Sequence, residues 1–144
     1  MQEFGIKGMK VLLFAFEEGF PDTPYLPHNV VPECYLYTGT HDNAPVRGWF
    51  EEEAKPEHRA RMREYFGRDL SAEEASSVFI RLAMATVADT VIIPLQDILG
   101  LGAAARMNRP GISRGNWRWR FTDADLSEKV RITLHSMTAA YARD

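Results

Sequence analysis

The most informative part of this chain is Cys34-Tyr35-Leu36-Tyr37-Thr38-Gly39-Thr40-His41-Asp42-Asn43. Its first half is short and apolar enough for a β-strand, and its second half places an imidazole, a carboxylate and an amide where that strand ends. In a parallel α/β barrel, residues after the carboxyl ends of the strands form the active site. A carboxylate held there by polar neighbours can stabilise a cationic sugar transition state. The alternative is structural, because an aspartate after a strand is also a common turn former or helix cap.

Two further apolar runs predict the other strands of a sheet. Lys10 to Phe16 is continuously apolar after its first residue, which is typical of a strand covered on both faces in a parallel sheet. Val91 to Leu95 is short and β-branched, and it predicts a third buried strand. The strand in the middle is expected over Tyr35 to Thr38.

Helical patterns separate the second strand from the third. We expect a helix to begin near Pro45 and another to span Pro56 to Phe66, where Gly67 ends it. Ser71-Ala72-Glu73-Glu74 reads as a capping box, in which the serine and the second glutamate satisfy free amides at the start of a third helix.

The chain is expected to end in one more helix, which begins near Thr122 or Asp123. Its apolar residues face one way, as in a helix packed on a sheet: Leu126, Val130, Leu134, Met137 and Tyr141. The order is therefore strand, loop, strand, helices, strand, long loop, helix. This order favours an α/β fold with parallel strands and helical crossovers.

Other polar residues follow or approach the strand ends. Gln96 and Asp97 follow the third strand in the same topological position as Asp42. Glu17 and Glu18 follow the first strand and can supply a second carboxylate about 5 Å from Asp42, the spacing of a retaining pair; the alternative is that they are solvated loop residues.

A proline-rich connection and an arginine-rich segment supply the remaining candidates. His28 and Asn29 can exchange hydrogen bonds with sugar hydroxyls, or they form a turn beside Pro27. The segment from Arg106 to Arg120 interleaves arginine with tryptophan, which suits either nucleobases with phosphates or the faces of pyranose rings. Since the net charge is −3, we expect no nucleic-acid partner.

Composition excludes several other classes. The longest apolar runs are too short to cross a bilayer, so no membrane association is predicted. The four histidines and the lone Cys34 lack ligand spacing, and no glycine-rich phosphate loop follows a strand, so we expect no metal and no cofactor. A single cysteine, together with the absence of a signal-like segment over Met1 to Gly5, predicts a cytoplasmic protein.

Several motifs together resemble the amylomaltases, which are 4-α-glucanotransferases (disproportionating enzymes) of glycoside hydrolase family 77. The resemblance runs in order along nearly the whole chain. It is carried by the segments 8–16, 25–29, 37–43, 87–101, 106–111 and 115–120.

The resemblance implies a fold, a reaction and a site. It implies that the chain is about strands six to eight of a (β/α)₈ TIM barrel, and that α-1,4-glucan segments are transferred with retention through a covalent glucosyl-enzyme intermediate. It implies that Asp42 is the transition-state stabiliser and that His41 contacts the sugar beside it. The substrate-binding candidates are His28, Asn29, Asn43, Gln96, Asp97, Asn108, Pro110, Asn116 and Trp117.

The same resemblance implies an incomplete site. Residues 1–144 form a single segment that matches the last quarter to third of a family member, and the nucleophile and the acid/base belong to earlier strands. We therefore expect this chain alone to be inactive. Because three parallel strands cannot close a barrel, we also expect self-association or pairing with an N-terminal part. The alternative function is a non-catalytic module that binds α-glucan or another partner.

Overall fold

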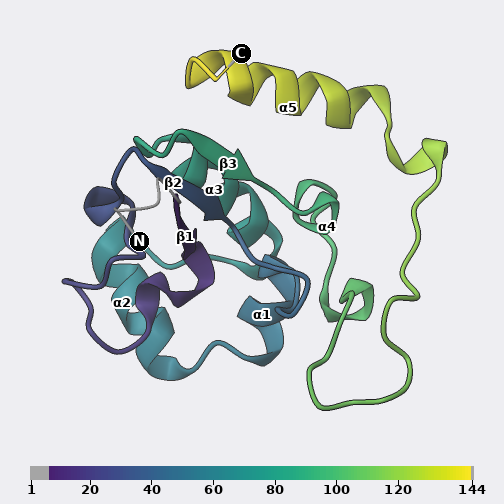
Figure 1. Ribbon diagram of the computed structural model, residues 1–144, viewed down its shortest axis with the longest axis horizontal. Coiled ribbons are helices and arrows are strands. Elements are labelled where there is room, and N and C mark those ends of the chain that lie inside the picture. The colour runs from purple at the N-terminus through teal and green to yellow at the C-terminus, as the bar shows by residue number, and fades with distance from the viewer. Residues whose placement is uncertain (1–6, 144) are drawn as a thin grey trace.

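The structure is a computed structural model that describes residues 7–143, so the segment Met1 to Gly5 lies outside the described residues. At its centre is a three-stranded sheet in the order β1-β2-β3, in which both pairs of neighbours are parallel (Figure 1). Met9, Tyr35 and Thr90 are aligned across the three strands. The prediction of an α/β segment with three parallel strands is confirmed.

The first strand differs from its prediction. β1 spans Gly8–Val11 and is followed at once by the 3₁₀ helix η2, Leu12–Phe16. The predicted strand over Lys10 to Phe16 therefore combined the end of a strand with a helical turn. The physical reason is that Leu12, Leu13, Ala15 and Phe16 are all buried, and a continuous apolar run carries no period that separates a strand from a buried helix.

The second strand is close to its prediction and the third is shorter. β2 spans Cys34–Tyr37, within one residue of the expected limits. β3 spans only Thr90–Ile92, because Pro94 introduces the short helix α4, Leu95–Ile98. β3 is also less buried than predicted, and Ile92 is 38% exposed.

The helices between β2 and β3 form where the sequence predicts them. α1 spans Val46–Glu52 directly after Pro45, and α2 spans Pro56–Phe66 and ends at Gly67, whose φ of 70° is left-handed. α3 spans Ala72–Met84, and the side chain of Ser71 accepts a hydrogen bond from the amide of Glu74. The expected return contact from Glu74 to the backbone is replaced by an ion pair with Arg68.

The described part of the chain ends with α5, Glu128–Ala140, which begins after Ser127 rather than near Thr122. Figure 1 shows it beside α3 and β3, at the end of a long extended segment. Met137 of α5 packs against Ile80 and Met84 of α3. The prediction that this helix packs on a sheet was therefore wrong in its partner, because a second face of α3, with Ile80 and Met84, is also apolar.

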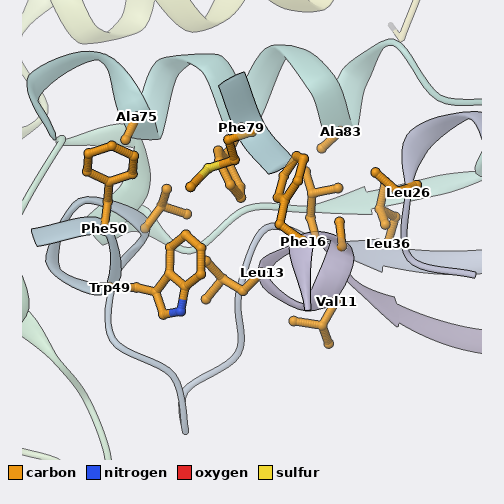
Figure 2. Close-up of a cluster of buried hydrophobic side chains, with 14 of the residues drawn as sticks. Val11, Leu13, Phe16, Leu26, Leu36, Trp49, Phe50, Ala75, Phe79 and Ala83 are labelled. Carbon is orange, nitrogen blue, oxygen red and sulfur yellow. The ribbon is translucent and has the colours of Figure 1, made fainter. Parts of the chain in front are cut away.

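The main core lies between the sheet and the helices. Figure 2 shows Phe79 and Ala83 of α3 facing Phe16, Leu13 and Trp49. Gly48 of α1 allows the backbone near Ala103 to pass very close to α1. A Cβ atom at position 48 would lie 2.3 Å from the backbone nitrogen of Ala103. This contact fixes the 3₁₀ helix η4, Ala103–Ala105, and so the start of the arginine-rich segment, against α1.

The two faces of the sheet differ in what covers them. Cys34 and Leu36 of β2 point to the helices and are fully buried. The alternate residues point the other way, and Met9 and Tyr35 are 60% and 40% exposed. Parallel strands are usually covered on both faces, so this apolar face is unusual.

Candidate functional site

A tight turn after β2 presents His41 and Asp42. The side-chain oxygen of Asn43 accepts hydrogen bonds from the backbone amide and the hydroxyl of Thr40, both at 2.9 Å. The backbone amide of Asn43 also donates to the carbonyl of Thr40. These bonds hold the turn, while the side chains of His41 and Asp42 remain 57% and 47% exposed. Asn43 therefore stabilises the turn.

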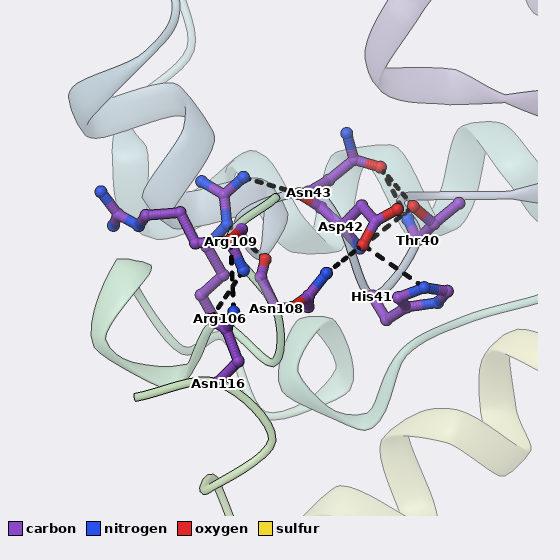
Figure 3. A network of polar contacts seen from close by, with 8 residues as sticks. All are labelled: Thr40, His41, Asp42, Asn43, Arg106, Asn108, Arg109 and Asn116. Atoms are coloured by element: carbon purple, nitrogen blue, oxygen red, sulfur yellow. Dashed lines mark hydrogen bonds and ion pairs between the residues drawn. The ribbon is translucent and has the colours of Figure 1, made fainter. Parts of the chain in front are cut away.

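The carboxylate of Asp42 is oriented through one of its oxygens (Figure 3). Asn108 donates from Nδ2 to Oδ1 of Asp42 at 2.6 Å, and Nε2 of His41 lies 3.4 Å from the same oxygen. Within residues 7–143, no hydrogen-bond donor of the chain reaches the second oxygen, Oδ2. A carboxylate that is fixed on one side and half exposed is suited to accept hydrogen bonds from the hydroxyls of a ligand.

The arginine-rich segment closes over the turn. The backbone amide of Asn108 donates to the carbonyl of His41 at 3.0 Å, and Arg106 donates from Nη2 to the carbonyl of Asp42 at 2.6 Å. The sequence identified Asn108 only through the family resemblance and did not single out Arg106 as a site residue. No local signal marks these contacts, because the partners lie more than sixty residues apart in the chain.

Trp117 lies beside His41. The two ring centres are 5.2 Å apart, and the tryptophan is 52% exposed. The backbone of Trp117 has a φ of 61°, and its amide donates to the carbonyl of Met107. A bulky residue in this left-handed region is strained, and such strain is held by the surrounding structure, often at functional sites.

A small cavity of about 170 Å³ lies next to these two rings. Its lining includes His41, Asn43, Gln96, Met107 and Trp117. Of the predicted substrate-binding residues, the structure thus brings Asn43, Gln96, Asp97 and Trp117 to one cavity, with Asn108 beside Asp42. The side chain of Gln96 is mostly buried and donates to the carbonyl of Ala105.

Asp97 lies beneath the turn rather than on its surface. It is 1% exposed; Oδ2 accepts from the hydroxyl of Thr38 at 2.6 Å, and Oδ1 accepts from the amide of Val46 at 2.7 Å. Burial raises the pKa of this carboxyl, and the two hydrogen bonds only partly oppose the shift. Because Thr38 precedes the turn and Val46 follows it, Asp97 ties its two ends together.

Three other predicted residues have their contacts elsewhere. His28 stacks on Tyr65 of α2, and its Nδ1 lies 3.3 Å from the phenol oxygen. Asn29 donates to the carbonyls of Pro21 and Thr23 within its own loop. Pro110 lies exposed in the arginine-rich segment. The structure brings none of the three into the cavity beside His41, so their contact with substrate stays a prediction.

Asn116 and the two early glutamates also have separate environments. The side chain of Asn116 accepts from the amide of Arg109 and donates to the carbonyls of Arg109 and Ile112, so it shapes its own loop. Glu17 and Glu18 line a different concavity, together with Trp49 and His58. Neither glutamate lines the cavity beside His41, and their role as a partner carboxylate for Asp42 stays a prediction.

Over residues 7–143, no three histidine, cysteine, aspartate or glutamate side chains gather in a way that could hold a metal ion. Within that range, no helix is both long and apolar enough to cross a bilayer.

Comparison with known proteins places this geometry in a family. Residues 1–127 match the family model of glycoside hydrolase family 77, described as 4-alpha-glucanotransferase. The chain is 41% identical over 143 residues to the 4-alpha-glucanotransferase of Aquifex aeolicus and 40% identical over 146 residues to that of Thermus thermophilus. These alignments cover 99% and 97% of this chain, but only 28% and 29% of the relatives.

A solved structure agrees with the sequence comparisons. The amylomaltase from Streptococcus agalactiae in complex with acarbose superposes with a TM-score of 0.89 at 36% identity. The superposition covers 99% of this chain and 28% of that one. The chain therefore spans little more than a quarter of the length of the relatives it matches. It belongs to glycoside hydrolase family 77, the 4-α-glucanotransferases.

Proposed function

We propose that this chain supplies the part of a 4-α-glucanotransferase site that stabilises the transition state. In this proposal Asp42 accepts hydrogen bonds from sugar hydroxyls through its second oxygen and stabilises the positive charge that develops on the sugar ring. His41 contacts the same sugar, and Trp117 borders it. The partner is an α-1,4-glucan, and no metal or cofactor takes part.

The observation that carries the proposal is the fixed, half-exposed carboxylate of Asp42. Asn108 holds Oδ1 at 2.6 Å, and the carboxylate lies at the carboxyl end of a parallel strand. Electrostatic stabilisation needs a charge that is already oriented before the reaction begins, and this arrangement provides it. A carboxylate that only caps a turn would instead bond to the backbone amides of that turn.

We propose further that the reaction requires strands beyond the three described. Retaining transfer needs a nucleophile and an acid/base in addition to a stabilising carboxylate, and the family resemblance assigns these two groups to earlier barrel strands. The exposed apolar face of the sheet, with Met9, Tyr35 and Ile92, supports this proposal because a closed barrel would cover it. We therefore expect no transfer by this chain alone.

A chimera tests the proposed function directly. The segment of the Aquifex aeolicus relative that aligns with this chain is replaced by this chain, and the product is incubated with maltotriose. We expect longer maltodextrins from the chimera and none from the 144-residue chain alone. Tryptophan fluorescence of the isolated chain, titrated with acarbose, measures ligand binding separately.

Each result has a distinct meaning. A chimera that folds but forms no maltodextrin longer than maltotriose would contradict the transferase proposal. If the chimera is inactive and the isolated chain still binds acarbose, a glucan-binding module without chemistry becomes the better description. Transfer by the isolated chain would overturn the proposal that other strands supply the remaining groups.

A further inference from the structure

The side chain of Arg106 makes three hydrogen bonds around the turn that carries Asp42, although Arg106 lies outside that turn. Its three guanidinium nitrogens each have a separate partner: Nη2 donates to the carbonyl of Asp42 at 2.6 Å, Nε to the carbonyl of Asn108 at 2.9 Å, and Nη1 to Oε1 of Glu53 at 2.6 Å. The side chain of Arg106 is 15% exposed, so these bonds are largely shielded from water.

These contacts join three separate parts of the fold. Glu53 immediately follows α1, Asp42 belongs to the turn after β2, and Asn108 lies in the arginine-rich segment. Figure 3 shows the guanidinium of Arg106 next to the backbone of the turn, with Asn108 reaching the carboxylate of Asp42. One side chain therefore sets the position of the Asp42 backbone and of the residue that holds its carboxylate.

We infer that Arg106 is a positioning residue for the site, which acts through Asp42 and Asn108. Without its guanidinium, Asn108 and Asp42 lose the common anchor that sets their separation. Lysine cannot replace it, because a single ammonium on a flexible stem does not present a rigid planar fork to three acceptors in different directions. The effect on ligand binding rests on the proposed function; the effect on the Asn108–Asp42 contact does not.

The test uses the isotope-labelled 144-residue chain and the variants Arg106→Lys and Glu53→Gln. The side-chain amide of Asn108 is followed by NMR without ligand, and the affinity for acarbose is then measured. In Arg106→Lys we expect the Asn108 amide to lose the shift of a hydrogen-bonded donor and the affinity to fall roughly tenfold. Glu53→Gln keeps both carbonyl contacts of Arg106, so a smaller change at the same resonance is expected.

Arg47→Lys is the matched control. Arg47 pairs with Glu51 on the same helix, and that pair does not include the turn. We expect its Asn108 resonance and its affinity to equal those of the wild type. A general loss of stability would move resonances throughout the chain, whereas a positioning role moves those of residues 40–43 and 108.

Each outcome decides the inference. An unchanged Asn108 resonance in folded Arg106→Lys would overturn it, and so would changes of equal size in Arg47→Lys. If Arg106→Lys does not fold, Glu53→Gln provides the test: a changed Asn108 resonance supports the inference, and an unchanged one overturns it. Transfer by the chimera tests the proposed function, and the ligand-free Asn108 resonance tests Arg106 whether or not the isolated chain binds acarbose.

Discussion

Two aspartates follow successive strands of the sheet, and the structure gives them opposite environments. Asp42 follows β2; its side chain is 47% exposed and one of its oxygens faces no donor among the described residues. Asp97 follows β3 and lies within α4; it is 1% exposed, and both of its oxygens accept hydrogen bonds from the chain. The sequence places both residues at the same edge of the sheet and predicts both as site residues.

The difference shows how the site is built. Asp97 joins Thr38 to Val46 and so fixes the two ends of the turn that carries Asp42. The buried carboxylate of Asp97 can do this because both of its oxygens accept hydrogen bonds within the protein. Oδ2 of Asp42 has no donor among the described residues, so it can accept a hydrogen bond from a ligand. Position after a strand therefore places both aspartates at the same edge of the sheet. Burial then distinguishes Asp97, which supports the turn, from Asp42, which we propose meets the ligand.

The largest expected effect is on activity, from Asp42→Asn in the chimera described above. Asparagine keeps an oxygen that can accept from Asn108, so the turn stays in place, but the negative charge that we propose stabilises the sugar is lost. We expect the rate of maltotriose disproportionation to fall roughly a thousandfold. The unfolding midpoint should match that of the parent chimera. Activity within tenfold of the parent would contradict a stabilising role for Asp42.

The second effect is on stability, from Asp97→Ala. The change leaves the Thr38 hydroxyl and the Val46 amide buried without an acceptor, so we expect the free energy of unfolding to fall by about 2–4 kcal/mol. Urea denaturation of the 144-residue chain measures it. Asp69→Ala is the control, because its ion pair with Arg63 is exposed and should contribute less than about 1 kcal/mol. Equal losses in the two variants would remove the distinction between a buried and a surface aspartate.

The third effect is on binding, from Asn108→Ala. Asn108 supplies the hydrogen bond that orients the Asp42 carboxylate, so its removal should weaken acarbose binding by roughly five- to tenfold. The stability should change little, because Asn108 is only partly buried. Asp69→Ala again serves as the control. An affinity equal to that of the wild type would mean that Asp42 is oriented without its amide partner.

Local signals in the sequence account for much of the fold. α2 has its predicted limits because Pro56 suits the first turn of a helix and Gly67 takes the left-handed conformation that ends one. The change from strand to 3₁₀ helix at Leu12 was not predictable in this way, since buried residues on both sides of that point look alike in sequence.

The site is less accessible to sequence than the fold. The turn residues His41 and Asp42 follow from the end of a strand, which is a local property. The bonds from Asn108 and Arg106 depend on how a long segment returns across the turn, and no spacing in the chain encodes that path. The environment of Asp97 is equally non-local, because its partners Thr38 and Val46 lie more than fifty residues away in the chain.

The smallest effect is a dependence of stability on pH. Burial raises the pKa of Asp97 in the folded protein above its value in the unfolded chain. Between these two values the folded state holds more protons than the unfolded state, so the contribution of Asp97 to stability falls as the pH rises. The asparagine of Asp97→Asn has no ionisable group, so this variant serves as the reference. We therefore expect the stability of the wild type relative to Asp97→Asn to decline through this window and to become constant above it.

Thr38→Val shows what sets the size of this decline. The Thr38 hydroxyl donates to Asp97 and favours its ionised form, which opposes the effect of burial. Removal of this hydroxyl in Thr38→Val should raise the pKa of Asp97 further, so the decline in stability should extend to higher pH. Urea titrations that compare Thr38→Val with the double variant Thr38→Val, Asp97→Asn measure this change. A wild-type advantage that instead grows with pH would mean that the two hydrogen bonds outweigh burial. The folded protein would then favour the ionised form of Asp97, as expected of an exposed aspartate. Asp97 and Asp42 would then differ only in their geometry.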